Sequence, residues 1–425
     1  MNNSLNFTLP SLEAKQYVLD NGLKVYAFEN NDMGVIRMEF FFPIAGTASQ
    51  NKIYSSLLTN NLISEGSKKH SAIEIANHID YYGAFIEKTL DKETASVCFY
   101  FLPKYQDVLM PCFEEIIKEP IFYQSEMDIY ISKLRQQHLV NNQKTDYISR
   151  VAFNEAIFGV KHPFGVIGSW EDFDLIQRED VIDFYNNFYS LNGASIILAG
   201  NINKGFISLL NKSFGNEDLQ VKNTPAIKPI PTNTDAQPIK KTIHLAQSVQ
   251  ASIRIGNISI SSNNDDFMSL SVLNCLLGGY FGSRLMSNIR QDKGYTYGIG
   301  SALYSYRDVG AFYIVADVKA EYCQNAIDEV YKEIETLHTQ RVGDKELERV
   351  KSYMRGDLLR SLDGSFELAN NFRPLLKYEL PTDYYNKFLE TINYISPEDL
   401  IMLSNKYLKI EKMTEIRVGN ETIIT

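Results

Sequence analysis

The first half of the chain mixes strand-like and helix-like patterns of apolar residues. Apolar runs at 17–19 and 23–28 flank Asp20-Asn21-Gly22, which predicts a β-hairpin with an Asn-Gly turn. Runs of strand length or alternating polarity predict further strands at 35–44, 93–102 and 194–198. Helical spacing of apolar residues predicts helices over 53–63, 72–82, 104–117, 124–143 and 148–158.

The second half shows the same mixture of patterns. Strand-like runs lie around Ile243 and at 253–260, and a strand pair is predicted at 297–306 and 310–318. Helices are predicted over 265–277, 325–337 and 345–362.

An internal repeat links the two halves. Residues 176–201 align without a gap to residues 395–420, at an offset of 219. The identical pairs are Ile176/Ile395, Glu179/Glu398, Asp180/Asp399, Ile182/Ile401, Asn186/Asn405, Ile197/Ile416, Gly200/Gly419 and Asn201/Asn420. Each copy predicts an acidic helix start, an amphipathic helix and a strand that ends at Gly-Asn. The alternative is chance similarity between two helix–strand segments. An offset of 219 is about half the chain length, however, as expected if the chain consists of two equal halves.

Length and composition predict two domains. A chain of 425 residues exceeds one ordinary core. Residues 216–238 carry four prolines among polar residues and show no periodicity, as linkers do. We therefore predict a first domain at 1–215, a linker at 216–238 and a second domain at 239–425.

Charge and hydropathy exclude some classes of function. The formal net charge of -10 argues against binding nucleic acid, since phosphate binding requires a basic face. The sequence lacks the 18 consecutive apolar residues of a membrane span, and residues 1–10 show no secretory pattern. Four cysteines lie far apart without a C-x-x-C pair. We expect a cytoplasmic protein with buried free thiols, no nucleic-acid partner and no membrane partner.

Residues 57–72 carry the most informative motif. They read Leu-Leu-Thr-Asn-Asn-Leu-Ile-Ser-Glu-Gly-Ser-Lys-Lys-His-Ser-Ala. This segment resembles the inverted zinc motif of the M16 (pitrilysin-type) metallopeptidases, His-x-x-Glu-His followed by an apolar run and Gly-[Thr/Ser]-Lys-Lys. In that alignment Leu57 and Asn61 replace the two histidines, and Asn60 replaces the general-base glutamate.

The chemistry of these replacements argues against a zinc site. Zinc needs three protein ligands and an open water position, and a general base must activate the water. Leu57 has no ligand atom, and Asn60 has no ionisable group. The family's third ligand, a glutamate, would fall near position 138, where the chain reads Gln136-Gln137-His138. We expect no metal in this chain. A real site elsewhere, from a different register, is the alternative.

Other segments extend the resemblance over about residues 12–420. They are Ala45-Gly46-Thr47, His162-Pro163-Phe164-Gly165 with Gly168, and the second-half run from Leu277-Gly278-Gly279 through Ser283-Arg284-Leu285 to Ile289–Tyr297. The resemblance implies an α+β fold of two similar domains, each a mostly antiparallel sheet flanked by helices. Two such pairs would enclose a chamber that admits peptides. In the two-subunit branch one subunit carries zinc and the other contributes an Arg/Tyr pair.

Arg290 and Tyr297 occupy the positions of that pair. The resemblance implies that they bind the scissile region of a peptide and stabilise oxyanion charge at a partner's zinc site. The alternative is that Arg290 forms a surface ion pair with Asp292 and that Tyr297 simply packs in a strand. The glycines nearby indicate turns and close backbone approach, and no nucleotide-binding pattern appears.

A row of His70, Glu74 and His78 is a second candidate for metal binding. The spacing of four residues could place all three on one helix face. A helix that begins near Ser71 would leave His70 at its cap, however, and a Glu74–His78 pair across one turn is the simpler interpretation. His138 is expected on a helix surface, and His162 is expected to pack in a loop.

Three functions follow as hypotheses. The first is the non-catalytic subunit of a cytoplasmic heterodimeric M16-type peptidase, whose homologous partner bears His-x-x-Glu-His and holds the zinc. The second is a structural scaffold without a proteolytic partner, which would form homodimers in isolation. The third is a zinc metallopeptidase with a rearranged site. In the first two the chain alone is not catalytic.

Overall fold

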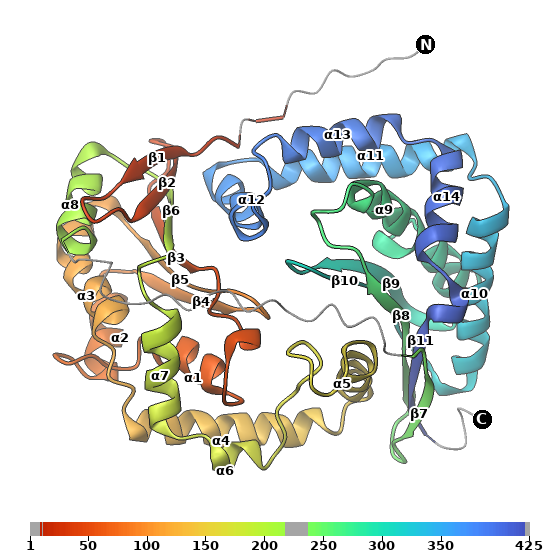
Figure 1. The fold of residues 1–425 in the computed structure, drawn as a ribbon, viewed down its shortest axis with the longest axis horizontal. Coiled ribbons are helices and arrows are strands. Elements are labelled where there is room, and N and C mark those ends of the chain that lie inside the picture. The colour runs from red at the N-terminus through yellow and green to blue at the C-terminus, as the bar shows by residue number, and fades with distance from the viewer. Residues whose placement is uncertain (1–8, 11, 217–236, 421–425) are drawn as a thin grey trace.

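Two mixed β-sheets form the framework of the molecule. The computed structural model describes residues 9–10, 12–216 and 237–420 (Figure 1). The first sheet has the order β1-β2-β6-β3-β5-β4, and the second has the order β7-β11-β8-β10-β9. The strands are β1 (Lys15–Val18), β2 (Lys24–Glu29), β3 (Ile36–Phe42), β4 (Phe85–Leu90), β5 (Ala95–Phe101), β6 (Ser195–Gly200), β7 (Lys240–His244), β8 (Gln250–Ser259), β9 (Thr296–Ser305), β10 (Gly310–Lys319) and β11 (Thr414–Gly419).

Helices flank both sheets. Those of the first half are α1 (Ser55–Leu62), α2 (Ala72–Tyr81), α3 (Gln106–Lys118), α4 (Gln124–Asn141), α5 (Thr145–Phe158), α6 (Asp172–Leu175), α7 (Arg178–Phe188) and α8 (Lys204–Phe214). Those of the second half are α9 (Phe267–Asn274), α10 (Cys323–Thr339), α11 (Asp344–Ser361), α12 (Ser365–Tyr378), α13 (Tyr384–Tyr394) and α14 (Pro397–Tyr407), with π-helical segments η4 (Cys275–Gly279) and η5 (Met286–Asp292). None of the helices in the described ranges is long and apolar enough to cross a membrane.

The predicted α+β class is confirmed, with one addition. In each sheet the described strands pair antiparallel except for one parallel pair, β2 with β6 and β7 with β11. The predicted hairpin is present as β1 and β2, and Gly22 in its turn has φ +90°. That left-handed conformation favours glycine. The pattern analysis does not predict β4, α8, α12 or α13.

The internal repeat is confirmed at the level of single residues. Helix α7 and strand β6 begin and end 219 residues before α14 and β11. Both helices start with a capping box, formed by Gln177 and Asp180 in one copy and by Ser396 and Asp399 in the other. β6 lies between β2 and β3 as β11 lies between β7 and β8. Apart from β1, which only the first sheet has, the two sheets therefore share one topology, in which β4 and β9 are equivalent edge strands.

The two halves exchange helices. α5 of the first half packs on β8 and β11 of the second sheet, and α12 of the second half packs on β2 and β6 of the first (Figure 1). Phe372 of α12 contacts the rings of Tyr26 and Phe28, at centroid distances of 5.0 and 5.4 Å. The apolar core around α12 thus contains residues from both halves of the sequence.

Ion pairs accompany both exchanged helices. Arg373 of α12 donates to Glu39 of β3 at 3.1 Å, and Arg37 donates to the other carboxylate oxygen at 2.6 Å. On the second sheet Arg254 of β8 forms an ion pair with Asp146 at the start of α5. Charge pairing therefore fixes the position of each exchanged helix on its sheet.

The predicted linker at 216–238 lies outside the described residues except for its two ends. The domain boundaries at 215 and 239 therefore stay a prediction. All strands of the first sheet precede that segment and all strands of the second follow it.

Candidate functional site

Helix α1 carries the three positions of the degenerate zinc motif. Asn60 is 1% exposed, and its Nδ2 donates to the carbonyl oxygen of Thr89 on β4 at 2.9 Å. Asn61 donates to the carbonyl oxygen of Leu57 one turn earlier, at 2.8 Å. The Oδ1 atom of Asn60 has no partner among the described groups. One amide oxygen is a poor ligand set for zinc, so these residues do not fit the metal.

The third-ligand position supplies no carboxylate either. Gln136 and Gln137 are exposed on α4. His138 is half-buried, and its ring lies 6.1 Å from that of Trp170 and 5.9 Å from that of Phe173. Its packing on these aromatic rings is a structural role.

The row of His70, Glu74 and His78 does not converge. The predicted helix start is confirmed, because α2 begins at Ala72 with Ser71 as its N-cap. Glu74 completes the capping box with Ser71, so its expected pairing with His78 is wrong. His70 contacts Glu115 at 2.8 Å, whereas His78 contacts the carbonyl oxygen of Val108. Across the ranges that the structure describes, no three His, Cys, Asp or Glu side chains are grouped to hold a metal ion.

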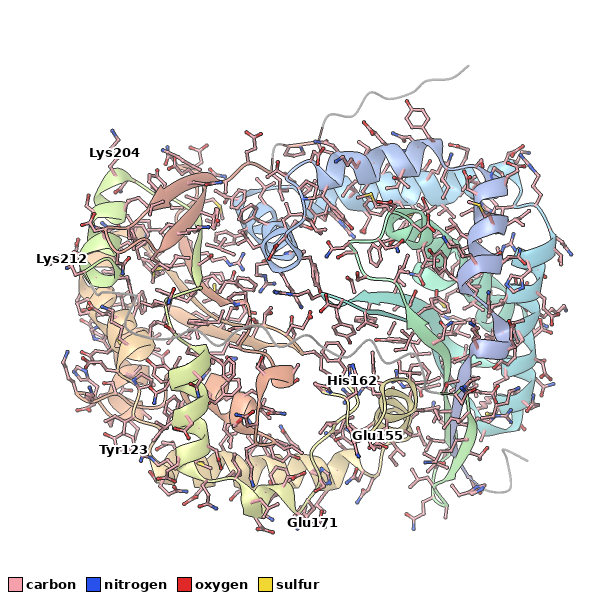
Figure 2. The ribbon with its side chains drawn as sticks, in the orientation of Figure 1. Tyr123, Glu155, His162, Glu171, Lys204 and Lys212 are labelled. Atoms are coloured by element: carbon pink, nitrogen blue, oxygen red, sulfur yellow. The ribbon has the colours of Figure 1, made fainter. Side chains whose placement is uncertain are left out.

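His162 packs in a loop, as predicted. Figure 2 shows it on the loop that follows α5. Its ring stacks on Phe158 at 5.2 Å, and its Nδ1 accepts from the backbone N–H of Phe164 at 3.1 Å. The same loop meets Tyr306 of the second half, whose ring lies 4.2 Å from that of Phe164.

The four cysteines are buried free thiols, as expected. Burial raises the pKa of Cys98 and Cys323 to about 11 and that of Cys112 and Cys275 to about 12. At neutral pH these thiols are protonated, so none is a ready nucleophile.

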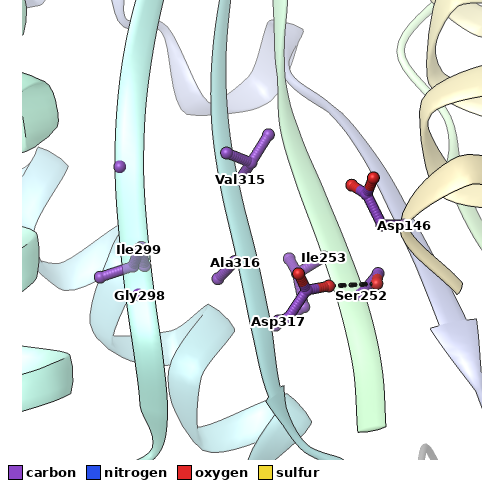
Figure 3. A pocket seen from close by; sticks show the side chains of 9 residues that line it. Asp146, Ser252, Ile253, Gly298, Ile299, Val315, Ala316 and Asp317 are labelled. Carbon is purple, nitrogen blue, oxygen red and sulfur yellow. Dashed lines mark hydrogen bonds between the residues drawn. The ribbon is translucent and has the colours of Figure 1, made fainter.

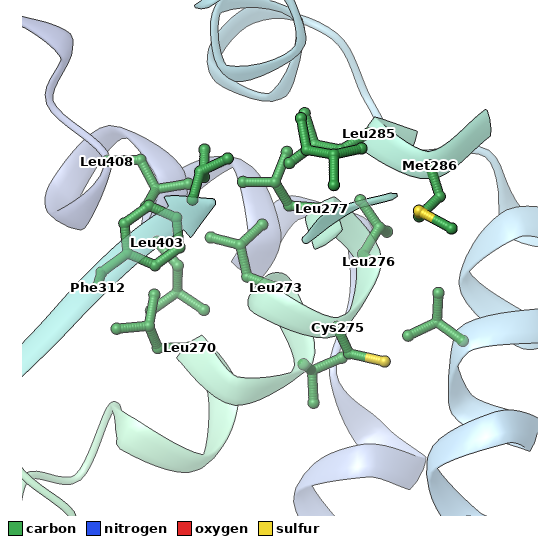
Figure 4. Packing of buried hydrophobic residues seen from close by; sticks show 14 of the residues in the cluster. Leu270, Leu273, Cys275, Leu276, Leu277, Leu285, Met286, Phe312, Leu403 and Leu408 are labelled. Atoms are coloured by element: carbon green, nitrogen blue, oxygen red, sulfur yellow. The ribbon is translucent and has the colours of Figure 1, made fainter. Parts of the chain in front are cut away.

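Arg290 lies on η5, which is held firmly in place. Asn288 donates to Glu329 and Glu333 of α10 at 2.9 and 2.7 Å. Upstream, η4 packs in the apolar core through Leu276 and Leu277 (Figure 4). The guanidinium of Arg290 lies 4.9 Å from the ring centre of Phe281, a cation–π distance. It forms no ion pair with Asp292 or with any other described residue.

Tyr297 lies at a β-bulge near the start of β9. Val318 on β10 pairs with Thr296, whereas Asp317 pairs with Gly298, so Tyr297 is the extra residue. The Thr296 hydroxyl donates to the carbonyl oxygens of Gly298 and Asp317 and accepts from the N–H of Gly298. The bulge leaves Tyr297 80% exposed. Bulges often redirect a side chain at functional sites.

Sequence reasoning did not identify the residues that position this pair. Phe281, Asn288 and Thr296 fall within the quoted motif or beside it, but only the structure shows what they contact. η5 and β9 pack together, so Arg290 and Tyr297 come from adjoining elements. Leu57, Asn60 and Asn61 lie on α1, on the other side of the centre of the molecule in Figure 1.

A cavity of about 360 Å³ lies between the first sheet and α12. Arg373 and Lys377 line it, but both are already paired, with Glu39 and with Asp91 and Glu93 respectively. Burial alone would lower the pKa of Lys377, yet the neighbouring carboxylates raise it above its usual value. These charges stabilise the contact between the halves.

Comparison with known proteins shows what the chain is similar to. The family model described as "Peptidase M16 inactive domain" matches residues 175–354. The "Uncharacterized zinc protease YmxG" of Bacillus subtilis is 25% identical over 359 residues, 83% of this chain and 85% of that protein. The "Non-peptidase homolog YmxG" of Helicobacter pylori is 20% identical over 380 residues, 88% of this chain and 86% of that protein.

Solved structures share the fold. The crystal structure of a peptidase M16 inactive domain from Pseudomonas fluorescens superposes with a TM-score of 0.87 and 21% identity, over 96% of this chain and 98% of that one. A chain of Complex III2 from Candida albicans, with Inz-5 bound, gives a TM-score of 0.74 and 15% identity, over 96% of each chain. Residues 175–354 thus match the M16 peptidase family model of the inactive-domain type, and the chain as a whole is similar to proteins named zinc protease and non-peptidase homolog.

Proposed function

We propose that this chain is the non-catalytic subunit of a heterodimeric M16-type zinc peptidase. A homologous partner would supply the zinc ligands and the general base. This chain would bind the peptide substrate and place Arg290 and Tyr297 at the cleavage point of the partner's site.

The observation that carries the proposal is the contrast between helix α1 and the adjoining elements η5 and β9. On α1, the amide hydrogens of Asn60 and Asn61 are bonded to backbone carbonyls, and no ligand set remains. On the adjoining elements η5 and β9, Arg290 has no ion pair among the described residues, and Tyr297 is exposed by a bulge. The three motif positions on α1 thus offer no zinc ligand set, whereas the half-buried Arg290 and the exposed Tyr297 keep hydrogen-bond donors.

These donors suit the chemistry of amide hydrolysis. Attack on a peptide carbonyl turns its oxygen into an oxyanion, and preorganised donors stabilise that charge more than they stabilise the ground state. Arginine offers several N–H donors in a fixed plane, and tyrosine adds one O–H donor. The cation–π contact with Phe281 restricts Arg290 before substrate binds, which limits the entropy lost on binding.

The edge strands give the substrate a place to bind. β4 and β9 each pair with a single neighbour among the described strands. An extended peptide can add to such an edge through main-chain hydrogen bonds. Tyr297 lies on the exposed part of β9, so a peptide along that strand would pass beside it.

The test is peptide hydrolysis by an equimolar mixture of this chain and the His-x-x-Glu-His-bearing M16 chain of the same organism. Arg290→Ala combined with Tyr297→Phe should lower kcat at least about 100-fold, the typical effect of losing one oxyanion donor. The matched control is Arg360→Ala with Tyr394→Phe, which changes an exposed arginine and an exposed tyrosine on α11 and α13. That control should hydrolyse at the wild-type rate.

Two results would contradict the proposal. If the Arg290/Tyr297 variant equals its control, the pair has no role, and a structural scaffold becomes the better account. If this chain binds stoichiometric zinc and hydrolyses peptide alone, it is a metallopeptidase with a rearranged site.

A further inference from the structure

The open face of β9 beside Tyr297 contains a pocket that the proposed function leaves unexplained. It has a volume of about 140 Å³ and crosses the second sheet from β9 past β10 to β8 (Figure 3). Its polar groups come from three elements, Asp146 at the start of α5, Ser252 on β8 and Asp317 on β10. Its edge is formed by Gly298 and Gly300 of β9.

The internal repeat shows that glycine creates this pocket. Val418 pairs with Ser252, which pairs with Asp317, which pairs with Gly298. The equivalent row of the first sheet, in the same order, is Ala199, Arg37, Tyr100 and Phe85. Two residues farther along, on the same face, Gly300 of β9 corresponds to Glu87 of β4. Large side chains in the first sheet therefore occupy the positions that glycine leaves open in the second sheet.

Packing and backbone geometry do not require glycine at position 298. A Cβ added there would meet nothing within 4 Å, and φ is not in the left-handed range. Glycine in a strand is unfavourable by roughly 0.5–1 kcal/mol relative to alanine. At position 298 the absence of a side chain therefore keeps space open without serving the fold, whereas at position 300 a Cβ would lie 3.2 Å from the carbonyl oxygen of Gly278, so close packing also favours glycine there.

The charges of the pocket favour a cation. Asp317 is exposed and accepts a hydrogen bond from Ser252, and it has no ion pair among the described residues. Asp146, at the start of α5, also lines the pocket (Figure 3). Arg254 is the nearby positive group, and it is already bonded to Asp146 and to Ser149. Two carboxylates, Asp317 and Asp146, and one guanidinium, Arg254, give this region a net charge of -1.

The dimensions favour a long side chain. Neighbouring strands are about 4.8 Å apart, so the distance from β9 to β8 is about 10 Å. A peptide lying along β9 beside Tyr297 would carry alternate side chains over Gly298 and Gly300. Lysine and arginine combine a long apolar stem with a positive head, which matches glycine at the entrance and carboxylates farther in.

We propose that this pocket binds the lysine or arginine side chain of a peptide held at Arg290 and Tyr297. The inference rests on the proposed function, and it adds a specificity for basic residues. Asp317 would bind the positive head, and Gly298 and Gly300 would admit the stem.

The experiment measures binding of two fluorescent ten-residue peptides to this chain alone, by anisotropy at low salt. One peptide has a single central lysine, and the other has the uncharged analogue norleucine. Wild-type protein should bind the lysine peptide about five- to tenfold more tightly, as expected for one charge-assisted contact. Asp317→Asn should remove that preference and leave binding of the norleucine peptide unchanged.

Further variants control for folding and for long-range charge effects. Asp308→Asn removes an exposed acid from the turn of the same β9–β10 hairpin and should keep the wild-type preference. Gly298→Phe introduces the side chain that the first sheet has at the equivalent position, Phe85, and should weaken binding of the lysine peptide at least fivefold. Gly356→Ala, in an open position on α11, should change neither peptide.

The outcomes separate the two proposals. Equal binding of both peptides, or an unchanged preference in Asp317→Asn, would overturn the pocket assignment while leaving the proposed function standing. If neither peptide binds, both the proposed function and the pocket assignment are overturned.

Discussion

Replacing Glu39 by glutamine tests how the two halves are held together. Glu39 is fully buried on β3, and its two carboxylate oxygens accept from Arg37 and Arg373. Arg373 belongs to α12, so this carboxylate joins the two halves across 334 positions of sequence. Glutamine has nearly the same shape but no charge.

The expected cost follows from the burial of Arg37. Arg37 is 4% exposed, and Glu39 is the acidic side chain it is paired with in the described part of the chain. Removing one partner of a buried ion pair typically costs about 3–5 kcal/mol. Glutamine retains one acceptor oxygen, so we expect the free energy of unfolding to fall by about 3 kcal/mol.

Urea unfolding followed by circular dichroism measures the loss. With a slope of about 3 kcal/mol per molar urea, expected for a large chain, the midpoint should fall by about 1 M. Glu29→Gln is the matched control, because Glu29 pairs with the exposed Lys15. Exposed pairs contribute about 1 kcal/mol or less. Equal midpoints for the two variants would refute the assigned role of Glu39.

Two further predictions concern the bulge and the contact between the halves. Thr296→Val removes the hydroxyl that bonds Gly298 and Asp317, so the free energy of unfolding should fall by about 1–3 kcal/mol. Thr296→Ser keeps the hydroxyl and should retain most of the wild-type stability. Equal losses in the two variants would contradict the bulge assignment. Burial would raise the pKa of Asp91, but Lys377 and two backbone N–H groups hold it below its usual value. Stability from a lowered carboxylate pKa is complete above the unfolded pKa, about 3.9, and is lost as pH falls through the folded pKa. Asp91→Asn should therefore lose less stability than wild type between about pH 5 and pH 3 in urea titrations, and parallel curves would exclude this role.

Sequence patterns predicted the parts of the fold that depend on local periodicity. The repeat of α7–β6 in α14–β11 was visible because the same helix start, apolar face and strand recur at one offset. α12, which contains Pro374, was not predicted from the pattern, although α3 was predicted despite Pro111.

The parts that were missed depend on contacts distant in sequence. β4 is an edge strand with partly exposed residues on both faces, so it lacks clear alternation. The pairing of Glu39 with Arg373 leaves no local signal. The pocket near Gly298 became apparent only when strand register aligned the two sheets.

At the candidate site, too, the sequence predicted the local motif but not the contacts between distant residues. The motif located Arg290 and Tyr297 and the substitutions at 57, 60 and 61. It could not show that Tyr297 is the extra residue of a bulge or that Phe281 lies against Arg290, because both depend on three-dimensional packing.

The most direct test of the central claim measures zinc content and peptide hydrolysis together. This chain, its His-x-x-Glu-His-bearing partner and their equimolar mixture would each be assayed. The account predicts that this chain carries no stoichiometric zinc and that only the mixture hydrolyses peptide efficiently. One zinc per chain in the isolated protein, lost on chelation together with its own peptidase activity, would contradict it.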